Sequence, residues 1–254
     1  MTSLVTQLDR LTNAGSVEEL WDIHTRQMTP YGFDRLMYGF TRYRTSTGLG
    51  DPQDWVLLSS QSTEYMKVFF DEGLYYHAPM LRWALANNGA CSWRWMMDMN
   101  RVDNLTPSEL RVMEFNKSMK VTAGYTVSFR SISERAKGAI ALTAKAGVTQ
   151  DAVERTWAKH GPEIIVMNNV MHLKLLTLPY SGERNLTKRQ REVLQWVGDG
   201  KTTQDIAVLL GLTPATVEKH LRLAREALDV ETTAQAVLKA ALYNQMFVMD
   251  QDAA

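Results

Sequence analysis

The short segment LGLTP, residues 210–214, constrains the fold of this chain more than any other. It joins a helical pattern over residues 202–209 to a second one over residues 214–228. Gly211 permits the backbone of a sharp turn, Thr213 is a good helix cap, and the proline suits the first position of a helix. Two helices joined in this way are typical of a helix-turn-helix, so we expect one here.

The second of these helices has one apolar face and one polar face. Its apolar positions recur at spacings of four, three and four residues: Val217, Leu221, Ala224 and Leu228. The opposite face is polar and partly basic: Ala215, Lys219, Arg222 and Glu226, with Glu218 beside them. A recognition helix needs this arrangement, because its back packs on the domain core while its front enters the major groove.

Five side chains of this helix are candidate DNA contacts. We assign base reading to Arg222 and Lys219, because long cationic donors pair well with guanine. Glu218 is expected to accept a hydrogen bond from cytosine. Thr216 and His220 lie at the flanks of the polar face, where contact with phosphates is expected.

Basic residues also gather where the first two helices of this region begin: Lys188, Arg189, Arg191 and Lys201. Such side chains, together with helix N-termini, hold phosphates. Any soluble helix has a polar face, and that alternative would be preferred for a lone helix; the turn and the preceding helix favour DNA binding. The whole chain has 28 basic and 28 acidic residues. Binding by one copy is therefore expected to be weak and sensitive to salt.

Residues 186–247 resemble the four-helix DNA-binding domain of the LuxR class of bacterial transcription regulators. The resemblance rests on the motifs Leu-Thr before Glu192-Val-Leu, Gly200-Lys201-Thr, Gly211-Leu, and Thr216-Val217 with His220. It implies a homodimer on an inverted-repeat operator in double-stranded DNA. The last helix carries an apolar stripe, which suits either a dimer seam or packing within the domain: Ala234, Val237, Leu238, Ala241 and Leu242.

The chain is expected to be α+β and to consist of a sensor domain (1–176), a linker (177–185, TLPYSGERN) and an all-α DNA-binding domain (186–254). In the first part, helical patterns cover residues 3–13, 17–29, 62–72, 79–87, 106–119 and 149–176, the last interrupted at Gly161-Pro162. Strand patterns cover residues 36–43, 55–59, 124–130 and 138–144. This order predicts an antiparallel sheet with helices on its faces.

The first part resembles, over residues 15–175, the autoinducer-binding domain of quorum-sensing LuxR regulators. The resemblance implies an α-β-α sandwich that senses acyl-homoserine lactones, and Pro79 and Trp93 match its pattern. Tyr65 stands where the family has Trp, Phe69 where it has Tyr, and Ala78 where it has the Asp that accepts the ligand's amide N–H. An amide N–H buried against Ala78 would cost roughly 1–3 kcal/mol if left unpaired.

A small hydrophobic signal is therefore expected in a pocket of seven residues: Gln61, Tyr65, Phe69, His77, Ala78, Trp83 and Trp93. Such pockets are mostly apolar, with a few placed polar groups. Two alternatives stay open for these residues, since the aromatics also suit a plain core and His77 also suits the surface. Two alternatives stay open for the protein as well: a solo regulator that senses a non-lactone signal, and a dimeric DNA-binding protein that needs no ligand.

Other classes of protein are poorly supported. The single cysteine, Cys91, excludes an internal disulfide and suits a reducing compartment. No signal peptide and no membrane-spanning run is visible, so a cytoplasmic protein without membrane contact is expected. We expect no enzyme, no catalytic residues, no metal site and no cofactor, because nothing places a base near Cys91 and no metal-ligand spacing occurs.

Overall fold

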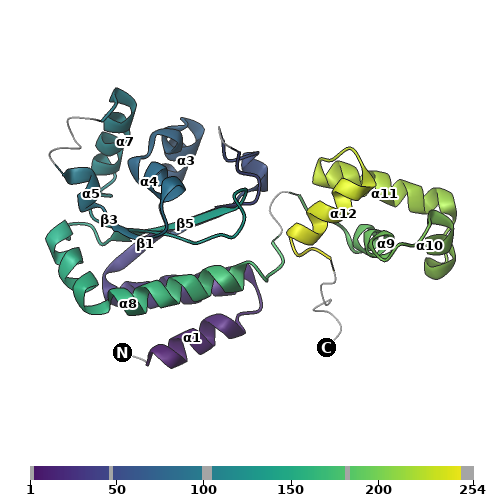
Figure 1. Cartoon of the computed structure of the whole chain (residues 1–254), viewed down its shortest axis with the longest axis horizontal. Coiled ribbons are helices and arrows are strands. Elements are labelled where there is room, and N and C mark those ends of the chain that lie inside the picture. The colour runs from purple at the N-terminus through teal and green to yellow at the C-terminus, as the bar shows by residue number, and fades with distance from the viewer. Residues whose placement is uncertain (1–2, 46–47, 99–104, 181–183, 247–254) are drawn as a thin grey trace. The chain divides into compact units, whose positions relative to one another are not determined.

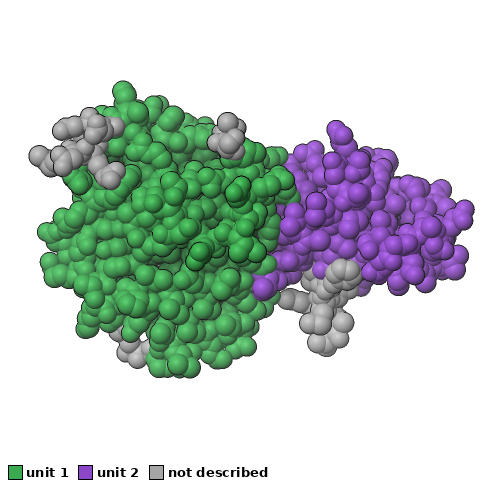
Figure 2. Space-filling view, in the orientation of Figure 1, with its two compact units in different colours: residues 1–176 green, residues 177–254 purple. Residues whose placement is uncertain are grey.

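The chain divides into two compact units, Met1–Leu176 and Thr177–Ala254 (Figure 2). The computed structural model describes residues 3–45, 48–98, 105–180 and 184–246. Residues 181–183 of the predicted linker, and residues 247–254 of the predicted DNA-binding domain, lie outside the described residues. We describe each unit by itself.

The first unit is built on a five-stranded sheet in the order β2-β1-β5-β4-β3. Every neighbouring pair of strands is antiparallel, which confirms the predicted sheet and the α+β class. The strands are β1 (Phe33–Thr41), β2 (Val56–Ser59), β3 (Gly89–Ser92), β4 (Gly124–Ser128) and β5 (Lys137–Ala144). Strand β3 was not predicted, because its sequence, Gly-Ala-Cys-Ser, is short and lacks the β-branched and aromatic side chains that mark strands.

Helices cover both faces of this sheet, as an α-β-α sandwich requires (Figure 1). Helices α1 and α8 lie below the sheet in this view and α3, α4 and α7 above it. The α-helices are α1 (Leu4–Asn13), α2 (Val17–Met28), α3 (Thr63–Asp71), α4 (Pro79–Ala86), α5 (Arg94–Met97), α7 (Pro107–Ser118) and α8 (Gln150–Leu175). Short 3₁₀ turns cover η1 (Thr29–Tyr31), η2 (Pro52–Asp54) and η3 (Leu74–His77).

The helix starts follow from local capping. The N-cap side chains Ser16, Ser62 and Thr149 each accept a hydrogen bond from a backbone N–H in the first turn of α2, α3 and α8. Thr106 and Glu109 form the predicted capping box at the start of α7. These caps occupy backbone donors that would otherwise lack a partner at each helix start.

Helix α8 runs without a break through Gly161 and Pro162, so the predicted interruption there is wrong. Pro162 lacks an N–H and removes one hydrogen bond of the helix, but it lies on the exposed side. Gly161 is buried beneath a tryptophan, since a Cβ there would come within 2.8 Å of Nε1 of Trp157. The Trp157 ring in turn stacks on Tyr125 with centroids 3.8 Å apart. Packing of the long helix on the sheet outweighs the local preference of one proline.

The second unit contains four α-helices within the described residues: α9 (Lys188–Gly198), α10 (Thr203–Leu210), α11 (Pro214–Leu228) and α12 (Thr233–Leu242). These confirm the helical patterns predicted over residues 202–209 and 214–228 and the four-helix domain that the resemblance implies. Its core is small and apolar: Val193, Leu194, Ile206, Val217, Leu221, Ala224, Leu228, Ala236 and Ala240 are buried. Among the helices of the described ranges, none combines the length and the apolar character needed to span a bilayer.

Candidate functional site

A cavity of about 410 Å³ lies between the sheet and the helices α3, α4 and α7 of the first unit. This volume falls within the range of small-molecule sites. The lining is mostly apolar. It includes residues from all three helices, from η3 and from the strands β1, β2, β4 and β5. The site therefore joins parts of the chain that are far apart in sequence.

Small side chains on the sheet make room for the cavity. Gly39 and Ala139 face each other across β1 and β5, and Ala141 follows on the same face of β5. Ile140 and Leu142 alternate with these alanines along β5, so their side chains point to the opposite face, where both are fully buried in the other core. The alternation of small and large residues along β5 therefore places a bulky core on one face of the sheet and an open floor on the other.

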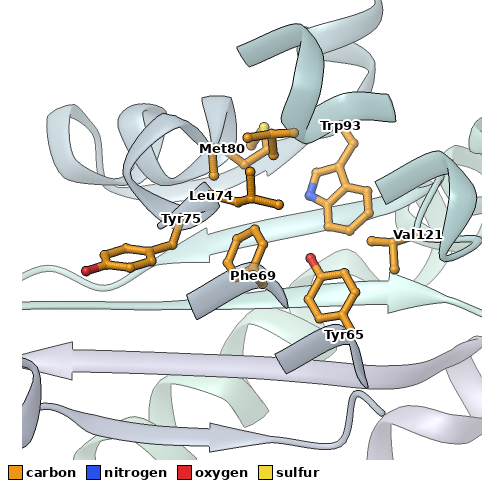
Figure 3. Close-up of a cluster of buried hydrophobic side chains, with 9 residues drawn as sticks. Tyr65, Phe69, Leu74, Tyr75, Met80, Trp93 and Val121 are labelled. Atoms are coloured by element: carbon orange, nitrogen blue, oxygen red, sulfur yellow. The ribbon is translucent and has the colours of Figure 1, made fainter. Parts of the chain in front are cut away.

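Aromatic rings from α3 and η3 form one wall of the cavity. The rings of Tyr65 and Phe69 stack with centroids 5.2 Å apart, because the residues are one helical turn apart. Figure 3 shows Phe69 between Tyr75 on one side and Tyr65 on the other, with Trp93 above them. The adjoining rings of Trp55 and Phe70 pack against Tyr75.

Tyr65 is tied to α7. Its hydroxyl donates to Oδ1 of Asn116 at 2.9 Å, and its side chain is only 3% exposed. Burial raises the pKa of the Tyr65 hydroxyl above its ordinary value, so the group stays protonated. Asn116 also lines the cavity, and it was not predicted. Tyr65 therefore contributes to the site as one member of a pair.

Trp93 is held by the neighbouring strand β4. Its indole Nε1 donates to Oγ1 of Thr126 at 2.9 Å, and both side chains are buried. Gly124 lets the ring approach this closely, since a Cβ there would come within 3.1 Å of the ring and 2.2 Å of the Leu142 carbonyl oxygen. The indole N–H is therefore already occupied by a protein acceptor.

Gln61 and Ala78 complete the cavity lining at two helix starts. The Gln61 side-chain amide donates to Oγ1 of Thr143 at 3.2 Å. Ala78 is the N-cap of α4, offers no side-chain cap, and has its carbonyl oxygen occupied by the backbone N–H of Arg82 at 3.1 Å. Ala78 therefore presents only a methyl group to the cavity.

The structure brings five of the seven predicted pocket residues to this cavity: Gln61, Tyr65, Phe69, Ala78 and Trp93. His77 and Trp83 are not among its lining residues. His77 ends η3 with an exposed side chain, while Trp83 is half-buried on α4. Ala78 precedes Pro79, and the turn at this point directs the neighbouring His77 outward. Asn116, Thr126 and Thr143 were not predicted, because each pairs with a residue from another part of the chain.

The helix-turn-helix lies in the second unit, between α10 and α11. Gly211 adopts a left-handed backbone with φ of 64°, which an L side chain would strain. The Thr213 hydroxyl accepts from the backbone N–H of Thr216 at 3.2 Å, and Pro214 occupies the first helical position. The turn is thus formed as its sequence predicts.

Helix α11 has the two predicted faces. Its buried residues are Val217, Leu221, Ala224 and Leu228. Glu218, Lys219 and Arg222 are exposed, and Thr216 and His220 are half-buried at the flanks. Together these side chains form a polar front of the kind that enters a DNA groove.

Two residues of this front already make contacts within the unit. Arg222 pairs with Glu226 at 2.5 Å, and both side chains are more than half exposed, at 55% and 56%. Such an exposed pair contributes little to stability, so the guanidinium can exchange its partner at small cost. Glu218 accepts from the Thr203 hydroxyl at 2.7 Å and thereby joins α11 to the start of α10.

The predicted phosphate-binding residues Lys188 and Lys201 lie at helix starts. Lys188 is the first residue of α9, and Lys201 directly precedes Thr202, the N-cap of α10. Both side chains are exposed. Cations beside helix N-termini suit phosphate groups, because the backbone N–H groups at the start of a helix also donate hydrogen bonds to a bound anion. Within the described ranges, no group of three or more His, Cys, Asp and Glu side chains is arranged to hold a metal ion.

Each of the two units matches a known protein family. Residues 16–175 match the family described as "Autoinducer binding domain". The chain belongs to this family of LuxR-class regulators. Residues 184–240 match "Bacterial regulatory proteins, luxR family". The chain is therefore a transcription regulator of the LuxR family, with one domain that binds a small signal molecule and one that binds DNA.

Two named relatives span most of the chain. The transcriptional activator protein LuxR of Aliivibrio fischeri is 23% identical over 193 residues, which are 74% of this chain and 74% of that protein. The transcriptional activator protein AnoR of Acinetobacter nosocomialis is 20% identical over 230 residues, covering 89% of this chain and 91% of that one. Both identify transcriptional activators as relatives of this chain.

Two solved structures share the fold. Escherichia coli SdiA matches with a TM-score of 0.51 and 17% identity over 96% of this chain and 98% of its own. The N-acylhomoserine lactone dependent factor CepR2 of Burkholderia cenocepacia matches with a TM-score of 0.53 and 14% identity, over 68% of this chain and 93% of its own. At these identities the likeness establishes the fold alone.

Proposed function

We propose that this regulator is controlled by a small acyl signal that binds in the cavity of the first unit. The observation that carries the proposal is an apolar cavity of about 410 Å³ inside the autoinducer-binding domain, walled by Tyr65, Phe69, Ala78 and Trp93. Gln61 and Asn116 supply polar groups beside these walls. This combination of apolar walls and a few placed polar groups is typical of a binding site for a small hydrophobic molecule.

The fold neighbours indicate which compounds to try. CepR2 is described as dependent on an N-acylhomoserine lactone, and SdiA has been solved in complex with octanoyl-rac-glycerol. Both compounds have an apolar chain and a small oxygen-rich head. A ligand of this shape would place its chain against the aromatic wall and its head near the polar groups.

A thermal-shift assay with a cavity-filling variant tests the proposal. Acyl-homoserine lactones and octanoylglycerol at saturating concentration should raise the Tm of the wild-type protein, because a ligand that binds only the folded state stabilises it. Ala141→Leu places a larger side chain on the cavity floor and should abolish the shift. Ala86→Leu makes the same change at an exposed position of α4 outside the lining residues and should leave the shift intact.

The alternative is a DNA-binding protein that needs no ligand. The absence of any Tm shift across lactone and non-lactone compounds, together with operator binding that no compound changes, would establish this alternative and refute signal control. A shift with a non-lactone compound alone would identify a solo regulator with a different signal.

For the second unit we propose that α11 reads bases through Lys219 and Arg222, with Glu218 as an acceptor for cytosine. Lys188, Lys201, Thr216 and His220 would contact phosphates, and the operator would be an inverted repeat, because a symmetric dimer presents two identical recognition helices. The regulator would act in the cytoplasm, where the DNA is.

We further propose that α12 contributes to the homodimer seam. Ala236 and Ala240 are buried in the unit, whereas Leu238 is 61% exposed and its neighbours Ala234 and Ala241 are exposed. These three residues lie at spacings of four and three, so they share one face of the helix. Leu238→Glu should shift the protein toward the monomer in analytical ultracentrifugation; an unchanged dimer would exclude α12 from the interface.

A further inference from the structure

A hydrogen-bonded cluster joins the edge strand β3 to the first turns of α8, on the face of the sheet away from the cavity (Figure 1). Ser92 of β3 and Tyr125 of β4 are paired across the two strands. Both hydroxyls donate to the carboxylate of Glu154 on α8: Ser92 to Oε1, and Tyr125 to Oε2 at 3.0 Å. One side chain of α8 therefore holds two neighbouring strands.

The Glu154 side chain acts as an ionised acceptor. Burial alone would raise the pKa of its carboxyl. The hydrogen bonds that the carboxylate accepts and the charge of Arg94 outweigh this effect and hold the pKa below its ordinary value. Because an ionised carboxylate only accepts hydrogen bonds, both hydroxyls must turn their hydrogens toward it. The direction of each bond is thus fixed.

The Ser92 hydroxyl also fixes the backbone of the turn that follows it. Its oxygen accepts from the Arg94 backbone N–H at 3.1 Å and from the Gln150 side-chain amide at 3.0 Å. The Arg94 guanidinium pairs with Glu154, with Nε 3.4 Å from Oε1. Both residues that flank Trp93 in the chain are therefore tied to the start of α8.

Trp93 points to the other face of the sheet. It lines the cavity, as does Met96 of the next turn, whereas Ser92 and Arg94 are not among the lining residues. Neighbouring residues at the end of a strand project to opposite faces of the sheet. Glu154 therefore anchors the backbone beside Trp93 from the face opposite the cavity, and it does not line the site itself.

This wall of the cavity has few other supports. Among the described strands, β3 lies at an edge of the sheet and pairs only with β4. The helix α5 that follows it has only four residues. On the cavity side, the Trp93 indole is held by Thr126. A short segment at a sheet edge opens more readily than a central strand, so its side-chain anchors decide how firmly the wall is held.

We propose that Glu154 is a positioning residue of the signal cavity. It touches no ligand, and it acts by keeping Trp93 and the turn after it in the arrangement that lines the site. This inference rests on the proposed function, because it assigns a residue to that same site. If only a fraction of the molecules has the wall in place, the apparent Kd rises by the inverse of that fraction. Loss of the carboxylate should therefore weaken ligand binding.

Isothermal titration calorimetry on the full chain compares two glutamates of α8. The probes are octanoylglycerol and N-octanoyl-homoserine lactone. Glu154→Ala should raise the Kd about tenfold, as expected if the wall is in place in about one molecule in ten. Glu163→Ala is the matched control and should leave the Kd unchanged. Glu163 also accepts from a tyrosine hydroxyl, that of Tyr31 at 3.2 Å, but neither residue lines the cavity.

A second variant removes the same contact from the strand. Ser92→Ala deletes the hydroxyl that donates to Glu154, and it should raise the Kd by a similar factor. Because the two substitutions break one contact, the double variant should bind about as weakly as Glu154→Ala alone. Glu154→Gln keeps one carbonyl oxygen for Ser92 and should bind more tightly than Glu154→Ala. Ser92→Ala alone keeps the test valid should Glu154→Ala not fold.

Hydrogen exchange of the full chain without ligand measures the wall directly. The Trp93 backbone N–H donates to the Gly124 carbonyl at 3.1 Å, so it is protected while the wall is in place. In Glu154→Ala the peptide that covers residues 89–98 should exchange faster than in wild type, and saturating probe should slow it again. In Glu163→Ala it should exchange as in wild type. A general loss of stability would not confine the change to this peptide.

The outcomes separate the two claims. Wild-type Kd values in both Glu154→Ala and Ser92→Ala overturn the inference and leave the proposed function in place. Exchange of residues 89–98 that Glu154→Ala leaves unchanged overturns it as well, as does an equal rise in Kd in Glu163→Ala. Binding of neither probe by the wild-type protein overturns the proposed function of the cavity, while the exchange comparison still decides whether Glu154 fixes the wall.

Discussion

Two buried histidines on the far side of the sheet from the cavity should make the first unit sensitive to acid. His24 is fully buried on α2, and His172 is buried on α8. Burial lowers the pKa of each ring from 6.5 to about 4, and the charge of Arg42 adds to the effect at His172. Both rings are therefore neutral in the folded protein at physiological pH.

The surroundings of His24 explain why it resists a proton. The Asn168 amide nitrogen donates to the Ile164 carbonyl at 2.8 Å, which turns its oxygen toward Nε2 of His24 at 3.0 Å. The ring therefore carries its hydrogen on Nε2 and leaves Nδ1 as a bare acceptor. That Nδ1 is buried without a hydrogen-bond partner. Protonation would bury an unpaired charged N–H, which is strongly unfavourable.

His172 is enclosed by rings. Its Nδ1 lies 2.8 Å from the Tyr38 hydroxyl, and its ring stacks on Phe129 with centroids 4.1 Å apart. Gly138 permits this packing, since a Cβ there would come within 2.9 Å of the imidazole. A charged imidazolium in this position would lose its hydration without gaining an anionic partner among these neighbours.

The sign and size of the effect follow from linkage. Because the folded pKa of each histidine is lowered, the unfolded chain binds the proton more readily, and stability falls as the pH drops from about 6.5 to about 4. At pH 5 each ring should cost about 2 kcal/mol relative to pH 7.5. Two such losses are a large part of the roughly 5–15 kcal/mol that stabilises a typical domain.

Urea unfolding at pH 7.5 and pH 5.0, followed by tryptophan fluorescence, measures this loss. The signal reports mainly on the first unit, which holds all the tryptophans but one: Trp21, Trp55, Trp83, Trp93, Trp95 and Trp157. His172→Gln should be less stable than wild type at pH 7.5, yet its loss on acidification should be smaller by about 2 kcal/mol. His77→Gln, at an exposed position, is the control. A loss in His172→Gln equal to that of wild type would refute burial of a neutral His172 as the cause.

Two further predictions concern the cavity wall and the DNA face. Gly124→Ala should destabilise the first unit by more than about 2 kcal/mol in urea unfolding, because overpacking is costly and the new Cβ would meet the Leu142 carbonyl oxygen and the Trp93 ring; an unchanged midpoint would contradict the close packing. Arg222→Ala should relax base preference at one operator position by about 1–3 kcal/mol, whereas Lys201→Ala should weaken binding to all sequences about equally. Competition binding with single-base operator variants compares the two, and intact selectivity in Arg222→Ala would exclude it from base reading.

Most of the fold could be predicted from the sequence, because its signals are local. The capping box of Thr106 and Glu109 and the turn at Gly211 each depend on residues within a few positions, and the structure has both. The pair Gly161-Pro162 shows the limit of such local signals, because it predicted a break in a helix that runs through it unbroken. Whether the helix continues there depends on the Trp157 ring and on packing against the sheet, which no local pattern reveals.

The cavity could be predicted only in part. Tyr65 and Trp93 were found through the register of a family pattern, but their partners Asn116 and Thr126 come from other elements. The floor of the cavity had one local signal, the small residues that alternate with Ile140 and Leu142 along β5. Reading it required knowing which face of that strand carries the helices α3, α4 and α7.

The two buried histidines and the cavity lie on opposite faces of one sheet. Ligand binding and protonation should therefore shift the same folding equilibrium of the first unit. A ligand at 100 times its Kd stabilises the folded state by about 2.7 kcal/mol. That is slightly more than the roughly 2 kcal/mol lost at one buried histidine at pH 5. At pH 5, saturating ligand should therefore offset about as much free energy of unfolding as one buried histidine loses. The acid midpoint of fluorescence should then move to lower pH with ligand in wild type, but not in Ala141→Leu. A midpoint that ligand leaves in place would show that the cavity and the histidine face belong to separate cooperative units.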